Sequence, residues 1–333
     1  MRRTVSLAVT LLLTSAGVAG CTGARDALTI YSGRDEALVG PLLERFADET
    51  GIPIDVRYGD SADLALLIDE EGEDTPADVF LSQTPGAVGF LDEQGRLADL
   101  PREMLERVEA RFEAPDGRWI GLTARQRVLV YNSELVDRSE LPNSVFDLTQ
   151  ERYAGRVALA PTNGSFQVFI SAMIQTEGED VALEWLRAMA EGGAPTYADN
   201  SSIVDAVARG EVEMGLVNHY YNYRYLAEDP SAPSRNYVFP DGDLGSLLIA
   251  STVSMIATTD KQDEARRFIE FLLSDESQAY FAEETFEYPL AEGAEPSPEL
   301  PPLDTLEVPE VDISRLGHTL ELTTKLISES GLL

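Results

Sequence analysis

The hydrophobic residues of this chain alternate between short apolar runs and amphipathic stretches. Runs typical of buried strands occur at residues 27–31, 54–58 and 77–81. Between and after them, apolar residues recur at helical spacing over 38–50, 62–71 and 87–94. This β-α-β-α-β order favours a mainly parallel sheet with helices on both faces.

The same alternation returns further along the chain. The predicted strands and helices are 156–160, 166–176, 179–190, 203–209 and 213–217. Two strands are predicted between the two series, at 119–122 and 127–132. An apolar run at 247–256 follows the second series and could return to the first. Two further helices are predicted at 263–273 and 313–327, with a proline-rich stretch over 296–309 between them.

This pattern predicts an α/β protein of two lobes, each a mainly parallel sheet flanked by helices. The expected N-terminal lobe comprises residues 27–125 and about 251–302, and the C-terminal lobe comprises 126–250 and about 303–333. Because open α/β sheets bind ligands beyond the carboxyl ends of their strands, we expect a ligand cleft between the lobes.

The N-terminus is typical of an exported protein. Arg2 and Arg3 precede an apolar run that is too short to span a bilayer, and small residues then lead to Cys21. The sequence Val-Ala-Gly-Cys resembles a bacterial lipobox, which predicts a signal peptide over 1–20, a lipidated Cys21 and a tether over 21–26. We therefore expect a body anchored by lipid to the outer face of the cytoplasmic membrane. The alternative is an ordinary signal peptide with a chance cysteine.

Composition excludes several function classes. A formal net charge of −34 excludes electrostatic attraction to nucleic acid or to an anionic membrane. The single cysteine cannot form an intrachain disulfide, and with only His219 and His318 beside it the chain has no Cys/His zinc cluster. HExxH, GxSxG and P-loop motifs are absent from the sequence, so we do not expect an enzyme. The acidic surface suits either a saline or extracellular setting or a GC-rich genome.

The most unusual segment is Asn-His-Tyr-Tyr-Asn-Tyr-Arg-Tyr over 218–225, directly after a buried strand. The adjacent Tyr220 and Tyr221 could stack on a ligand, pack in the core, or offer phenolate oxygens to a hard trivalent metal. A phenol with a pKa near ~10 is a poor ligand for Zn²⁺ or Ca²⁺ at neutral pH. Fe³⁺ is acidic enough to displace the phenolic proton, because metal binding drives ligand deprotonation.

Three further segments offer groups that could bind an anion. Asn163, Gly164 and Ser165 lie between a strand and a helix, where backbone N–H groups can hold an anion, although an ordinary helix cap is the alternative. Asn200 precedes another helix in the same way. Arg125 and Arg127 share one side of a strand and could clamp an oxyanion, unless they are merely surface charges.

Two loops of the N-terminal lobe also carry polar groups. Residues 31–35 (Tyr-Ser-Gly-Arg-Asp) join a strand to a helix, and taken alone Asp35 there is explained by helix capping. Residues 79–84 (Val-Phe-Leu-Ser-Gln-Thr) end a strand with polar side chains directed toward the expected cleft.

Taken together, these segments resemble the ferric-iron substrate-binding proteins of bacterial ABC transporters. The segments that carry the resemblance occur in the family's order, and they are 31–34, 72–80, 125–131, 161–166 and 218–221. The resemblance implies a type II periplasmic-binding fold whose two lobes close by a hinge on Fe³⁺. It also implies presentation of the metal to an ABC permease in the membrane. We expect the receptor to be a monomer.

The resemblance further implies the residues of the site. Tyr220 and Tyr221 match the iron-binding pair, and a synergistic anion such as phosphate or carbonate completes the coordination. The matching anion-binding positions are Asn163, Gly164, Ser165, Asn200 and Asn218, with Arg125 or Arg127 for carbonate.

The chain departs from the family in the N-terminal lobe. It has Asp35 where some members have histidine and Gln83 where they have glutamate. Asp35 is a plausible hard oxygen ligand for Fe³⁺, whereas Gln83 is a weak one that better suits a hydrogen bond to bound water or anion. Two other readings stay open: a receptor for a small oxyanion or organic solute without metal, and a structural or signalling lipoprotein.

Overall fold

The computed structural model describes residues 27–312, 315–316 and 319–333. The predicted signal peptide, the tether with Cys21, and His318 lie outside the described residues.

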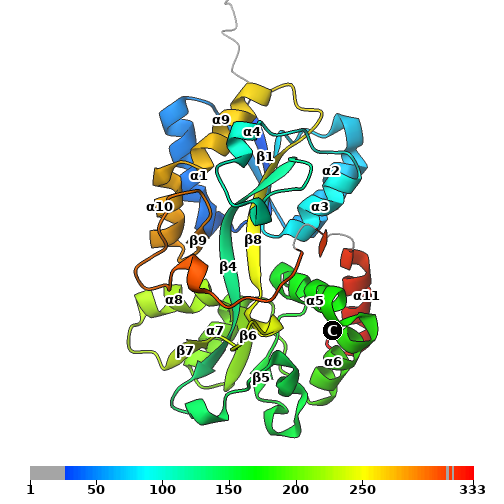
Figure 1. Cartoon of the computed structure of the whole chain (residues 1–333), viewed down its shortest axis with the longest axis vertical. Coiled ribbons are helices and arrows are strands. Elements are labelled where there is room, and N and C mark those ends of the chain that lie inside the picture. The colour runs from blue at the N-terminus through cyan, green and yellow to red at the C-terminus, as the bar shows by residue number, and fades with distance from the viewer. Residues whose placement is uncertain (1–26, 313–314, 317–318) are drawn as a thin grey trace, which may run out of the picture.

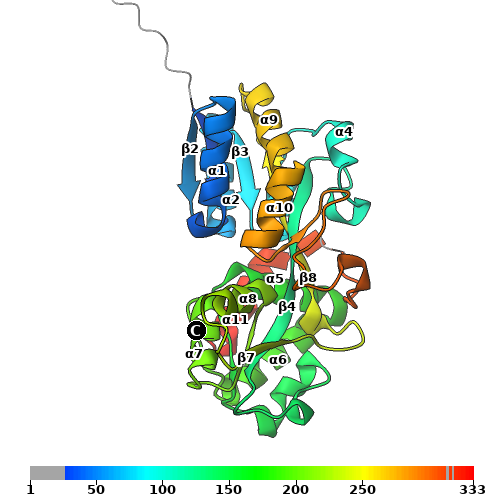
Figure 2. The same cartoon turned by 90° about the vertical axis from the view of Figure 1, so that its left-hand side faces the viewer.

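The first lobe is built on the predicted β-α-β-α-β unit. Its elements are β1 (Leu28–Ser32), α1 (Glu36–Thr50), β2 (Ile54–Tyr58), α2 (Ser61–Glu71), β3 (Val79–Ser82), α3 (Pro85–Glu93) and the short α4 (Arg102–Leu105). Strand β1 pairs in parallel with both β2 and β3. Helices α9 (Gln262–Leu272) and α10 (Asp275–Glu284) return to this lobe late in the chain, where they lie near α1 (Figures 1 and 2). Thus the sequence pattern predicted the core of this lobe but not α10.

Two long strands connect this lobe to the rest of the molecule. The expected pair of strands around 119–132 is one continuous strand, β4 (Trp119–Asn132), and the apolar run near 250 is β8 (Leu248–Met255). They pair antiparallel and run between the lobes in Figure 1. The sheet order is β2-β1-β3-β8-β4-β6-β5. The sheet is therefore mixed rather than mainly parallel, because one strand leaves the first lobe and the other returns to it.

The second lobe contains the remaining elements. They are β5 (Val157–Ala158), α5 (Gly164–Glu177), α6 (Glu179–Glu191), α7 (Asn200–Ala208), β6 (Met214–Asn218), α8 (His219–Glu228), β7 (Ser234–Tyr237) and α11 (Leu320–Ser330). Strand β5 is parallel to β6, whereas β6 and β7 both pair antiparallel with β4. The predicted boundaries at 125/126 and 250/251 fall inside β4 and β8. The sequence pattern missed α8, β7 and the short β9 (Tyr288–Pro289), which pairs with β4.

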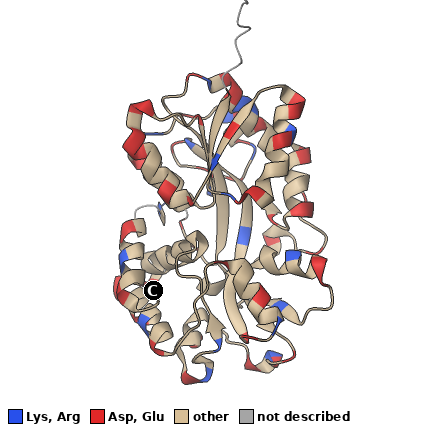
Figure 3. Cartoon of the chain, turned by 180° about the vertical axis from the view of Figure 1, so that it is seen from behind, with Lys and Arg blue, Asp and Glu red and all other residues tan. Residues whose placement is uncertain are grey.

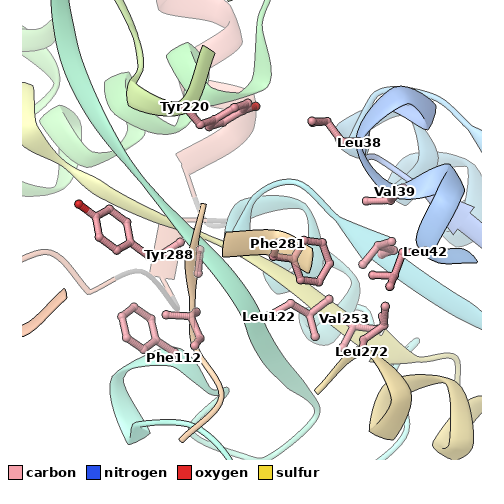
Figure 4. Packing of buried hydrophobic residues seen from close by; sticks show 14 of the residues in the cluster. Leu38, Val39, Leu42, Phe112, Leu122, Tyr220, Val253, Leu272, Phe281 and Tyr288 are labelled. Carbon is pink, nitrogen blue, oxygen red and sulfur yellow. The ribbon is translucent and has the colours of Figure 1, made fainter. Parts of the chain in front are cut away.

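A continuous hydrophobic core passes from one lobe into the other. It contains Leu38 and Leu42 of α1 together with Tyr220 of α8. Figure 4 shows the Tyr220 ring extending toward Leu38, so the start of α8 lies opposite the start of α1. A separate cluster fills the second lobe around Phe166, Phe169 and Trp185.

Acidic residues are spread over the helices of both lobes, as Figure 3 shows. Within the described part of the chain, no helix is both long and apolar enough to cross a membrane.

Candidate functional site

The two adjacent tyrosines lie in the first turn of α8. Strand β6 is buried along its whole length and ends at Asn218, so α8 begins where the strand stops. Tyr220 is fully buried and Tyr221 is 8% exposed. Their rings stack with centroids 4.2 Å apart and an interplanar angle of 27°. The end of a buried strand therefore presents two phenols side by side toward the first lobe.

Burial keeps both phenols protonated in the absence of a metal. It raises the pKa of Tyr220 well above the ordinary value, with further increases from Tyr221 and Glu287 that Arg34 and Arg125 oppose. Burial also raises the pKa of Tyr221, against which the neighbouring Tyr220 hydroxyl, Arg125 and Arg34 act. The Tyr220 hydroxyl has no hydrogen-bond partner of good geometry. Its oxygen is therefore available to a ligand.

Both arginines of the Arg-Gln-Arg segment are buried in β4. Arg125 is 0% exposed and Arg127 is 1% exposed, so the interpretation as surface charges is wrong. Arg127 donates to the side-chain oxygens of Asn218 (3.3 Å) and Asn200 (3.4 Å). Arg125 donates to the Ser165 hydroxyl at 3.4 Å and to a backbone carbonyl of the first lobe.

The asparagines and the serine complete this network. Asn163 caps α5, since its side-chain oxygen accepts from the Ser165 N–H at 3.0 Å. The same oxygen accepts from the Asn200 amide at 3.0 Å, so capping is not its whole role. The cap of α7 is Asp199 rather than Asn200. Asn218 donates to the Ser165 hydroxyl at 3.0 Å, which links the end of β6 to the start of α5.

In the described part of the chain, neither guanidinium group forms a salt bridge. Burial lowers the pKa of Arg125, and Glu287 opposes that shift from beyond salt-bridge distance. Burial, and then the neighbouring Arg125 charge, lower the pKa of Arg127 to about 9. Among the described residues, Nη2 of Arg127 and Nε of Arg125 are buried without a hydrogen-bond partner. Because a buried charge without a salt bridge is costly, the chemistry of this cluster of side chains fits a bound oxyanion.

The first-lobe candidates are held less firmly. Asp35 is exposed at the N-cap position of α1, and its side chain makes no capping hydrogen bond. It lies near enough to Tyr221 to raise the pKa of that phenol.

Gln83 lies against the start of α5. Its side-chain oxygen is 3.6 Å from the point where a Cβ on Gly164 would be. Both residues line a cavity of about 190 Å³ between the lobes. The Gln83 backbone carbonyl accepts the hydrogen bond from Arg125, and its N–H donates to the Ser61 hydroxyl at 2.9 Å. A Cβ on Gly33 would be 1.9 Å from that hydroxyl, so only glycine allows the β1–α1 loop to approach here.

Two buried groups beside the tyrosines were missed as site residues. Arg34 and Glu287 form an ion pair that is 3% and 0% exposed. Arg34 lies in the segment 31–34 that carries the family resemblance, but its sequence context indicates no role for it, and no motif surrounds Glu287. His219 accepts from the Gln126 N–H at 3.1 Å, and burial lowers its pKa to about 4. Among the described residues, no group of three His, Cys, Asp or Glu side chains could hold a metal.

Two α/β lobes joined by long strands, with a cavity between them, are typical of a solute-binding protein. A family model described as bacterial extracellular solute-binding protein matches residues 74–315, and the chain belongs to this family. The family is one of binding proteins rather than enzymes, as the sequence predicted.

Several individual relatives of the chain are named as ferric iron-binding proteins. The Fe(3+)-binding periplasmic protein of Serratia marcescens is 32% identical over 318 residues, which are 95% of this chain and 93% of the relative. The major ferric iron-binding protein of Neisseria meningitidis is 30% identical over 324 residues, 96% of this chain and 97% of the relative. The crystal structure of iron-bound HitA from Pseudomonas aeruginosa superimposes with a TM-score of 0.87 at 34% identity, covering 92% of this chain and 99% of that one. These matches confirm the family resemblance and the type II periplasmic-binding fold.

Proposed function

We propose that this protein is an extracytoplasmic receptor that binds Fe³⁺ through Tyr220 and Tyr221 together with a synergistic anion, and delivers the metal to an ABC-type permease. The observation that carries the proposal is the stacked tyrosine pair, which is buried beside two arginines that form no salt bridge within the described part of the chain. The names of its relatives support ferric iron as the cargo.

The oxygen donors of the site suit a hard trivalent ion. The Tyr220 oxygen has no competing hydrogen bond of good geometry, and the Tyr221 ring is stacked next to it. Fe³⁺ supplies the driving force to remove both protons despite the raised pKa values. Asp35 is the candidate third ligand, and Gln83 is better placed to hydrogen-bond a water or an anion.

Charge balance supports the synergistic anion. Fe³⁺ with two phenolates keeps a positive charge, and the Arg125 and Arg127 guanidinium groups add to it. Phosphate or carbonate would offset this charge and accept the unused donors of both arginines. The other groups proposed to hold the anion are Asn163, Gly164, Ser165, Asn200 and Asn218.

Export and anchoring complete the proposal. We infer that Cys21 carries the lipid anchor and that the receptor works as a monomer at the outer face of the cytoplasmic membrane. The lobes would close on the loaded site by hinge motion about β4 and β8. The closed receptor would then dock on the permease.

The proposal is tested by adding ferric citrate to the purified protein and recording visible absorption. Tyrosinate-to-iron charge transfer should colour the wild type, and Tyr221→Phe should lose or shift the band. Tyr225→Phe, one turn further along α8, is the matched control and should keep the band. A colourless wild type, or an unchanged band in Tyr221→Phe, would contradict the assignment.

The unpaired arginines favour one second candidate, a receptor for a small oxyanion without metal. Calorimetry with phosphate, sulfate and sugar phosphates in iron-free buffer separates the two functions. Tight binding that does not change when iron is added would support this alternative.

A further inference from the structure

The buried ion pair next to the tyrosines comes from segments that are far apart in the sequence. Arg34 follows β1, whereas Glu287 lies between α10 and β9. Arg34 Nη1 donates to Glu287 Oε1 at 2.8 Å, and its second amino group donates to the other carboxylate oxygen. Such a bidentate pair holds the guanidinium in one orientation.

The same carboxylate is tied to the strands that connect the lobes. Glu287 accepts from the Thr123 hydroxyl of β4 at 3.2 Å and from Thr285 at 3.1 Å. Thr123 in turn shares a 2.6 Å hydrogen bond with Ser251 of β8. The β4–β8 pairing shifts register between Gly121 and Thr123, at the same place. Arg34 is thus fixed relative to the point where the connecting strands are irregular.

Arg34 also adjoins the site. Unlike Arg125 and Arg127, Arg34 forms a salt bridge with a carboxylate, and this salt bridge fixes its guanidinium group in place. Asp35, the candidate first-lobe ligand, is the next residue along the loop.

We propose that Arg34, locked by Glu287 and Thr123, is a positioning residue that holds the Asp35 loop in place relative to the connecting strands, so that the first lobe presents Asp35 to the iron-loaded tyrosine pair. The proposal rests on the proposed function above. Closure of the lobes on the metal then depends on a group that does not itself ligate it.

The test compares Arg34→Gln, Arg34→Lys and the wild type. Iron affinity is measured by chelator competition, and lobe closure by small-angle scattering with and without iron. Arg34→Gln should keep the coloured band, lose iron affinity by about tenfold, which is the low end for groups outside the coordination sphere, and close less on loading. Arg34→Lys should recover part of both. Arg45→Gln, which breaks an exposed pair with Glu276 in the same lobe, is the control and should change neither.

A second variant provides the test if Arg34→Gln does not fold. Thr123→Val keeps the ion pair but cuts its tie to β4, so it should weaken closure and iron affinity several-fold. Wild-type affinity and closure in a folded Arg34→Gln, or in Thr123→Val if the first variant does not fold, would overturn the proposal while leaving iron binding intact. A wild type that binds no iron would overturn both this inference and the proposed function.

Discussion

The two sides of the cleft differ in how their candidate residues are held. On the second lobe, Tyr220 is fully buried, and Asn163, Ser165 and Asn218 belong to one hydrogen-bond network with the arginines. On the first lobe, Asp35 is exposed and its side chain makes no capping bond. One side is assembled before any ligand arrives, and the other has freedom to adjust.

This difference has an energetic basis. A buried phenol without a partner and two buried guanidinium groups without a carboxylate both cost stability, which a ligand can recover on binding. An exposed carboxylate such as Asp35 carries no such cost, so it recovers less free energy when a ligand binds. The second lobe should therefore dominate affinity, while the first lobe should adjust it.

The largest effect is expected from Tyr220→Phe. Removing this ligand should weaken iron binding by more than the ~10–100-fold typical of outer-sphere groups. The unloaded protein should be as stable as the wild type or about 1 kcal/mol more stable, because an unsatisfied buried hydroxyl is removed. Chelator competition and urea denaturation measure the two quantities. A large loss of stability would show that the hydroxyl stabilises the unloaded protein. It would contradict the view that the second lobe holds an unused oxygen for the ligand.

The next effect is the pH dependence of iron affinity. Both phenols have raised pKa values, so each must release a whole proton when iron binds near neutral pH. Protons then compete with the metal, and affinity should fall about 100-fold for each pH unit of acidification. Tyr220→Phe should reduce this slope to about tenfold, since one proton fewer is released. Competition with a chelator of known protonation behaviour gives the slope. An iron affinity that does not change with pH would exclude phenolate ligands.

A smaller loss is expected from Arg127→Met. We expect iron affinity in the presence of phosphate or carbonate to fall about tenfold, and the gain caused by adding the anion to shrink. Stability without ligand should not fall, because removing an unpaired buried charge offsets the loss of two long hydrogen bonds. Arg102→Met, at a side chain that is 88% exposed, is the matched control. An undiminished anion effect would argue against Arg127 as an anion-binding residue.

The smallest effects should come from the first lobe. Asp35→Asn keeps the shape but removes the charge, and should weaken iron binding by about tenfold or less. Gln83→Ala should cost less still, since a neutral amide adds little to a hard metal site. Titration of both variants beside the wild type would rank them. If Asp35→Asn matched the loss in Tyr220→Phe, the two sides would contribute equally and the comparison would fail.

Much of the fold could be predicted from periodicity alone. The strands β1, β2 and β3 and the helices between them lie within a few residues of the predicted ranges, because each buries one regular apolar face. The helix α8 was missed because His-Tyr-Tyr-Asn-Tyr-Arg-Tyr has no apolar face at helical spacing. Its first turn is buried instead through tertiary contacts, with Tyr220 in the core that Leu38 also joins.

The sequence by itself determined the lobed α/β architecture, and it predicts an export signal. It also determined which segments carry oxygen donors, since these depend on residue type and local order. Only the tertiary structure decided which of those groups meet. It buried Arg125 and Arg127 without a salt bridge among the described residues, paired Arg34 with Glu287, and left Asp35 exposed. Burial and pairing arise from chain segments up to 253 residues apart, and no local pattern encodes such distant contacts.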